Sequence, residues 1–137
     1  MRKVVETRDL KLIHAADRLC FPHDPACSYL GAAKWWIAKI DGSTAGYIGA
    51  VYNMSTGQVY NCRTGVLPWC RGQGLQKVLT RRVVRWAKSI HASAVVTDTV
   101  IENIASNNSL IACGFRMYEP EVPWTVPGGI YWRRKIG

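Results

Sequence analysis

The chain has 137 residues, of which 48% are hydrophobic, and a formal net charge of +9 at pH 7. This length predicts one domain, 1–137, with a hydrophobic core of its own. No apolar run reaches the ~18 residues of a membrane-spanning helix, and the first residues lack the long apolar stretch of a signal peptide. The five cysteines are scattered along the chain, which indicates free thiols in a reducing cytoplasm.

Positive charge is concentrated in the second part of the chain. Residues 58–137 hold eleven Lys and Arg against four Asp and Glu, whereas residues 1–57 hold seven against five. Such a surface suits an anionic ligand with several phosphates, a nucleic acid or an acidic partner. Charge alone does not separate these three classes.

In chain order, the first elements are a strand and two helices. A short strand is expected over 3–6. Apolar residues recur at helical spacing over 8–19, and Thr7 or Asp9 can cap the start of that helix. Two prolines end it, since proline cannot continue a helix. A second short helix is expected over 26–33.

The next segments predict three strands. The apolar runs over 35–40 and 45–52 flank a turn at 41–43, which predicts a hairpin. Another strand is expected over 58–66, and it must stop at Pro68 because proline has no N–H to donate to a sheet.

Two glycines, Gly72 and Gly74, follow this strand, and a helix begins near Leu75. A strand, a glycine turn and a helix together form a phosphate site, because glycines let backbone N–H groups approach an anion and the helix start adds partial positive charge. A tight turn without a ligand is the alternative. The segment lacks the Gly-Lys-Ser/Thr of a P-loop and the third spaced glycine of a dinucleotide fold.

The helix that starts at Leu75 is expected to reach about Ile90, because it carries one continuous apolar stripe. Its remaining surface is crowded with lysine and arginine, most of which we interpret as a solvated face. Lys77 differs, since it lies one turn from the glycines, where a phosphate could reach it.

The last elements are strands around one short helix. The segment 94–100 is apolar and β-branched, which predicts a buried strand. A short helix is expected after 107–109, ending just before Gly114. Strands follow over 115–118 and 130–136. The whole order predicts an α/β fold of the α+β type, with six to seven strands in a mixed sheet and helices on both faces.

Two motifs resemble the GNAT N-acetyltransferases. The segment 66–76 is similar to the family's coenzyme-A loop, Arg/Gln-x-x-Gly-x-Gly/Ala. Arg71 and Gly74 match its first two fixed positions, whereas Gln76 replaces its last small residue. A second segment, Asn-x-x-Ser followed by Gly-Phe within 103–115, resembles the family's other cofactor-contacting motif at the usual spacing.

The resemblance implies a mostly antiparallel sheet splayed between the strands over 58–66 and 94–100, about four helices, and acetyl-CoA as cofactor. The strand end would bind the pantetheine arm, and the glycine loop would wrap the pyrophosphate. The implied cofactor-binding residues are Thr64, Gly65, Val66, Arg71, Gly72, Gln73, Gly74, Leu75, Gln76, Lys77, Asn103 and Ser106. For the last two, a helix cap and turn is the alternative.

Asp98 is the expected general base. Strand alternation places it on the face of Val96 and Val100. It lies five residues before Asn103, where it resembles the carboxylate base of ribosomal-protein acetyltransferases, although those carry glutamate. A salt bridge to a nearby arginine is the alternative for Asp98. Glu102, at the mouth of the strand, is the second candidate.

The general acid is harder to assign. The family commonly places tyrosine where this chain has Leu110, which cannot transfer a proton, so Ser109 or water would have to serve. Tyr60 is expected to pack, because a phenol with a reference pKa near ~10 is a poor base. The Cys-x-x-His-x-x-x-Cys run within 20–27 offers only three ligands, so no metal is expected.

These motifs predict an acetyl-CoA-dependent N-acetyltransferase whose acceptor is a primary amine, on a protein N-terminus, a lysine or a small molecule. The alternative is a catalytically weak or inactive GNAT-fold module that binds acyl-CoA or associates with nucleic acid. Nucleic acid is not favoured, because no segment interleaves aromatic and basic residues. No membrane partner is expected, and both a monomer and a homodimer stay open.

Overall fold

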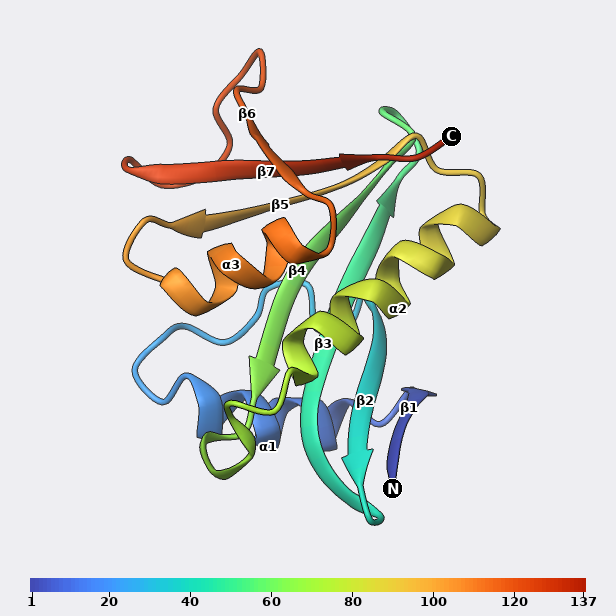
Figure 1. The fold of residues 1–137 in the computed structure, drawn as a ribbon, viewed down its shortest axis with the longest axis vertical. Helices are drawn as coiled ribbons and strands as arrows, with labels where there is room; N and C mark the ends of the chain where they lie inside the picture. The colour runs from blue at the N-terminus through green and yellow to red at the C-terminus, as the bar shows by residue number, and fades with distance from the viewer.

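The computed structural model describes all residues, 1–137, and places seven strands in one sheet with the order β1-β2-β3-β4-β5-β7-β6 (Figure 1). The strands are β1 (Arg2–Thr7), β2 (Lys34–Ile40), β3 (Ser43–Asn53), β4 (Gln58–Val66), β5 (Ala94–Val100), β6 (Arg116–Tyr118) and β7 (Gly129–Lys135). The helices are α1 (Leu10–Cys20), α2 (Leu75–Ser89) and α3 (Ile104–Ala112), with one 3₁₀ turn, η1 (Pro68–Cys70).

The helices cover both faces of the sheet. Helix α1 lies behind it in Figure 1, and α2 and α3 lie in front. Every strand pair is antiparallel except β4 with β5, which is parallel. The predicted α+β fold with a mixed, mostly antiparallel sheet is therefore confirmed. None of the three helices is both long and apolar enough to span a bilayer.

The core lies between α2 and the central strands. Leu79 and Val83 of α2, Ile48 of β3, and Val59 of β4 are at most 1% exposed. They come from the apolar stripe of the helix and from alternate positions of the strands, as the two periodicities require. This packing fixes the start of α2 relative to the end of β4.

Two expectations about the helices are wrong. Residues 26–33 form no helix. Residues 28–32 are in turns, and the carbonyl of Leu30 accepts a hydrogen bond from Trp35 Nε1, as the carbonyl of the preceding Pro25 does from Arg63. Helix α3 begins at Ile104, earlier than predicted, since Asn103 caps it by accepting a hydrogen bond from the Ser106 N–H at 3.3 Å. The chain therefore has three α-helices and a 3₁₀ turn.

The sheet is split between β4 and β5. These strands pair only from Gln58 to Tyr60 and from Ala94 to Val96. Beyond that point β4 continues along β3 as far as Val66, whereas β5 continues along β7. The two strands diverge as the arrows in Figure 1 show, so the splayed sheet is confirmed.

A bulge in β4 lies at the start of the split. Ala50 pairs with Asn61 and Gly49 pairs with Arg63, so Cys62 is an extra residue on this strand. A bulge changes the alternation of side chains. As a result Tyr60 and Arg63 both contact the α1 side of the sheet: the Tyr60 ring meets Tyr29, and Arg63 meets Asp17.

Candidate active site

A cleft of about 300 Å³ opens where β4 and β5 diverge, closed by the first turns of α2 and α3. Five of the residues singled out from the sequence line it: Thr64, Gln76, Asp98, Asn103 and Ser106. They come from four elements, and the fold brings them to one place because the split leaves the ends of β4 and β5 facing both helices.

The start of α2 differs from the other helix starts. Asp9 caps α1 and Asn103 caps α3, whereas α2 begins at Gly74 with no side-chain cap. Gly74 has φ 75° and Gly72 has φ 81°, a left-handed conformation that glycine adopts without strain. The first N–H groups of α2 therefore lack an internal partner, which makes them donors for an anion.

Cations surround this loop. Arg71 is exposed, and its Nε donates to the Val66 carbonyl at 3.2 Å, which ties the loop to the end of β4. Arg2 on β1 donates to the Gln73 carbonyl. No pattern in the sequence pointed to Arg2, because 71 positions separate it from Gln73 and only the folded chain brings the two together.

Gln76, the residue that departs from the family pattern, joins the two helices that flank the cleft. Its Nε2 donates to Ser106 Oγ at 2.9 Å. Asn103 uses its side-chain oxygen to cap α3. The alternative interpretation of Asn103 as a helix cap is thus what the structure shows, although Asn103 also borders the cleft.

Asp98 lies at the floor of the cleft and accepts two hydrogen bonds. One comes from the Tyr60 hydroxyl at 3.1 Å and the other from Thr125 Oγ1. Asp98 is in none of the ion pairs of the structure, so the alternative of a salt bridge to arginine is wrong. Its carboxylate faces neutral hydroxyls beside open space.

Tyr60 does more than pack. Burial raises the pKa of the Tyr60 phenol, and the negative charge of Asp98 and the hydrogen bond to it raise that pKa further. The hydroxyl therefore stays protonated at neutral pH and donates to Asp98. Sequence reasoning missed this pairing, because the two residues lie 38 positions apart on adjacent strands.

The other two catalytic candidates lie elsewhere. Glu102 is exposed in the turn between β5 and α3, and Ser109 is half-buried in α3; neither lines the cleft. Leu110, in the position where the family commonly has tyrosine, is 2% exposed and does line it. No group of three or more His, Cys, Asp or Glu side chains is arranged to hold a metal ion.

Tyr60 also borders a second cavity, of about 510 Å³. Tyr29 and Trp124 form the walls, with ring centroids 5.6 Å and 5.3 Å from that of Tyr60. Val96 and three uncharged polar side chains complete the lining, so no ionisable acid or cation faces this cavity. Trp69, 67% exposed, lines neither space.

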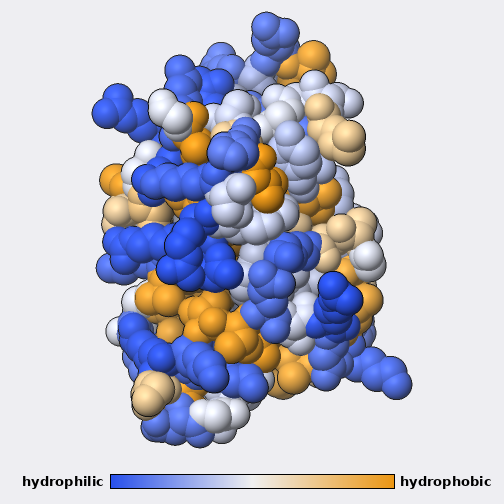
Figure 2. Space-filling model, turned by 90° about the vertical axis from the view of Figure 1, so that its right-hand side faces the viewer, coloured by the Kyte–Doolittle hydropathy of each residue, from blue (hydrophilic) through white to orange (hydrophobic).

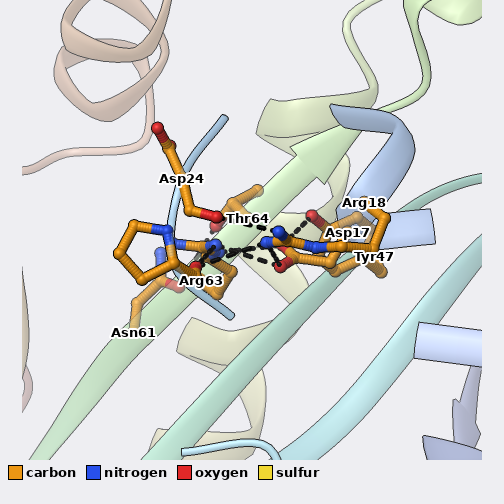
Figure 3. A network of polar contacts seen from close by, with 8 residues as sticks. Asp17, Arg18, Asp24, Tyr47, Asn61, Arg63 and Thr64 are labelled. Atoms are coloured by element: carbon orange, nitrogen blue, oxygen red, sulfur yellow. Dashed lines mark hydrogen bonds and ion pairs between the residues drawn. The ribbon is translucent and has the colours of Figure 1, made fainter. Parts of the chain in front are cut away.

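A buried ion pair holds α1 and the loop after it against β4 (Figure 3). Arg63 binds Asp17 in a bidentate manner, Nε to Oδ1 at 2.8 Å and Nη2 to Oδ2 at 3.0 Å. The Tyr47 hydroxyl donates to the same carboxylate, which is 2% exposed. Arg63 Nη2 also donates to the Pro25 carbonyl at 3.0 Å.

Burial alone would raise the pKa of the Asp17 carboxyl, but the hydrogen bonds from Arg63 and Tyr47 and the positive charge of Arg63 outweigh it, so the pKa lies below its usual value. The signal for this site was present in the sequence. Asp17 follows Ile13 at a spacing of four, on the apolar face of its helix, where an acid requires a partner.

The chain is similar to known proteins over most of its length. The model of the Acetyltransferase (GNAT) family matches residues 7–115. N-acetylaspartate synthetases from Rattus norvegicus and Homo sapiens are 31% and 30% identical to it over 94 residues, which cover 69% of this chain and 31% of each relative. The chain therefore spans about a third of the length of these curated relatives.

Solved structures share the fold over nearly the whole chain. A Bacillus subtilis acetyltransferase in complex with CoA has a TM-score of 0.82 at 14% identity, covering 99% of both chains. The ribosomal-protein-S18-alanine N-acetyltransferase of Escherichia coli has a TM-score of 0.79 at 14% identity, covering 99% of this chain and 94% of its own. With the family model matching from α1 to the end of α3, and the glycine loop facing a split sheet, this chain belongs to the acetyltransferase (GNAT) family.

Proposed function

We propose that the chain transfers an acetyl group from acetyl-CoA to a primary amine by direct attack within a ternary complex. The observation that carries this proposal is the split between β4 and β5 in front of the uncapped start of α2. The split exposes main-chain groups of β4 to a linear ligand, and the helix start offers free N–H groups to its phosphates.

Binding would use main-chain donors more than side chains. Thr64, Gly65 and Val66 would hold the pantetheine arm along the free part of β4. Gly72 to Lys77 would hold the pyrophosphate, with Arg71 and Arg2 adding charge. When bound in this way, the cofactor would supply an activated acetyl group near Asp98 and Tyr60, which line the cleft between the diverging strands.

Asp98 would accept a proton from the ammonium group of the acceptor, which leaves a neutral amine able to attack the thioester carbonyl. Its two hydrogen bonds, from Tyr60 and Thr125, hold the carboxylate in place where it lines the cleft. A general base in this position accounts for a ~10²–10⁴-fold acceleration in other enzymes. Leu110 offers no proton, so the leaving thiolate would take one from water, which a thiol pKa near ~8–9 permits.

The acceptor would enter through the aromatic cavity. Its uncharged lining favours an amine that carries a neutral, preferably aromatic or aliphatic, group. Two relatives are named N-acetylaspartate synthetases, but no cation lines the aromatic cavity, and Arg63, which lines the adjoining cleft, already binds both carboxylate oxygens of Asp17. An acceptor with two carboxylates would therefore find no free cation in the cavity.

An assay of free thiol release with acetyl-CoA tests the proposal. The amine panel should contain peptides with aliphatic and aromatic N-termini, a lysine peptide, a polyamine, tyramine and aspartate. We expect amine-dependent turnover, fastest with tyramine or an apolar N-terminus. Saturable acetyl-CoA binding without transfer to any of these amines would support the inactive binding module instead.

A further inference from the structure

A cavity of about 740 Å³ lies outside the candidate active site. It is bounded by the middle of α2, the end of α3, and strands β6 and β7, and it shares no lining residue with the cleft or the aromatic cavity. Five cations line this basic groove, and no aspartate or glutamate does: Arg81, Arg116, Arg133, Arg134 and Lys135.

The charge of the basic groove is not neutralised within the chain. None of its five cations is in an ion pair; the paired cations are the N-terminus, Arg18, Lys34, Arg63 and Arg82. Five like charges around one cavity repel one another, and a bound anion would relieve that repulsion. Without a bound anion, this repulsion lowers the free energy of unfolding.

Neighbouring contacts orient two of these arginines. The Arg134 Nη1 donates to the Cys113 carbonyl at 2.8 Å, and the Arg133 guanidinium lies 4.4 Å from the centre of the Tyr118 ring. Both contacts use only part of the donor set of a guanidinium. The remaining N–H groups stay free for the planar, bidentate recognition that arginine offers to phosphate.

The positively charged surface extends further than the area that one phosphate group would contact. Arg81 also borders a smaller hollow, of about 230 Å³, with Arg82 and Arg85. From Arg81 to Lys88, α2 advances roughly 10 Å. Figure 2 looks at the side that carries the C-terminal half of α2 with β1 and β2, and hydrophilic side chains form a band there beside an apolar patch.

We propose that the basic groove binds the phosphodiester backbone of a nucleic acid, without sequence preference. Arginine-rich clusters without acidic neighbours, extended over more than one phosphate spacing, match that ligand. Met117, 58% exposed, and Tyr118 line the same groove and offer apolar surface to a base. No single segment carries this pattern, because the cations come from α2, β6 and β7.

The experiment measures fluorescence anisotropy of a labelled 20-nucleotide RNA of mixed sequence and of a dT strand of the same length, at several salt concentrations. The test variant is R81Q/R133Q/K135Q, and the control is K3Q/K11Q/K39Q, which loses the same charge elsewhere. We expect at least 10-fold weaker binding for the test variant only, with a salt slope smaller by about 2, since each lost phosphate contact removes ~0.7.

Three results would overturn the proposal. The two triple variants could weaken binding equally, which would mean that only net charge matters. Saturating CoA could displace the RNA, which would make the groove part of the cofactor site. Polyglutamate could compete as well as RNA at equal charge, which would indicate an acidic protein partner. If the triple test variant does not fold, the single variants R133Q and K135Q replace it, and each is expected to weaken RNA binding in the same direction by a smaller factor.

Discussion

Asp98 is the residue on which the proposed chemistry depends, and its surroundings make it testable. D98N keeps the shape and the ability to accept a hydrogen bond from Tyr60, but it cannot take a proton. We expect kcat to fall ~10²–10⁴-fold, with little change in the KM for acetyl-CoA. Steady-state kinetics over the amine panel measure both constants.

The matched control for this change is D41N. Asp41 lies in the exposed turn between β2 and β3 with φ 50°, a conformation that asparagine tolerates. It should keep wild-type kinetics. Unchanged kcat in D98N would remove Asp98 from the mechanism, whatever the result for the control.

Single residues were only partly predictable. Strand alternation placed Asp98 on the correct face, because a period of two needs no tertiary information. Its partners Tyr60 and Thr125 lie 38 and 27 positions away, and only the pairing of the strands and the return of the last loop bring them to it. In the sequence, Gln76 only departs from the small residue that ends the coenzyme-A loop pattern. In the structure, its hydrogen bond to Ser106 connects α2 with α3.

At the scale of elements, helix α1 depends on the Asp17–Arg63 pair. D17N leaves Arg63 charged and without its partner beneath the helix, so we expect the free energy of unfolding to fall by about 3–5 kcal/mol. Urea titration at pH 7 measures it. D9N, at the cap of the same helix, keeps a side-chain acceptor and should cost far less.

The same pair predicts a pH dependence with a definite sign. The folded state lowers the pKa of Asp17, so the stabilisation is fully present above the unfolded value of ~3.9 and is lost as the pH falls through the folded value. Wild-type stability should therefore fall below about pH 4 more steeply than that of D17N. Parallel acid curves for the two proteins would contradict this assignment.

The start of α2 carries a further prediction. Gly74 has φ 75°, and a Cβ there would meet only Lys77 Cε at 3.8 Å, so G74A introduces backbone strain without a clash. We expect the strain to tilt the first N–H groups and to weaken acetyl-CoA binding by the folded protein about 10-fold, which is ~1.4 kcal/mol and similar in size to its ~1–2 kcal/mol effect on stability. Calorimetric titration would detect this, and equal affinity would contradict a main-chain phosphate site.

Elements with strong local signals were predicted well, and those governed by distant contacts were not. The strands β4 and β5 have the predicted bounds: Gly57 and Pro68 delimit β4, and a run of apolar, β-branched residues marks β5. The segment 26–33 resembled a helix, but hydrogen bonds to its carbonyls from Trp35 and to the preceding Pro25 from Arg63 hold it in turns. Start signals for α3 were ambiguous among several Asn and Ser residues.

At the scale of the whole molecule, the order of the strands determines where the cations and the cavities lie. The order β5-β7-β6 brings Arg116, Arg133 and Arg134 beside Arg81 of α2, although each lies at least 35 positions after Arg81 in the sequence. The excess of positive charge is visible in the residue counts, but its position in the fold is not. The split between β4 and β5 was predictable only from the family resemblance, because strand pairing that stops after three residues leaves no local pattern in the sequence.

The central claim is that acetyl-CoA lies in the split sheet and is held by main-chain N–H groups, and a ¹H–¹⁵N NMR titration tests it most directly. Acetyl-CoA should shift the amide signals of residues 64–66 and 72–77 with one saturable affinity and a stoichiometry of one. Signals from the basic groove, at 133–135, should stay in place. Saturable shifts confined to other residues, or no shifts at millimolar acetyl-CoA, would contradict the account.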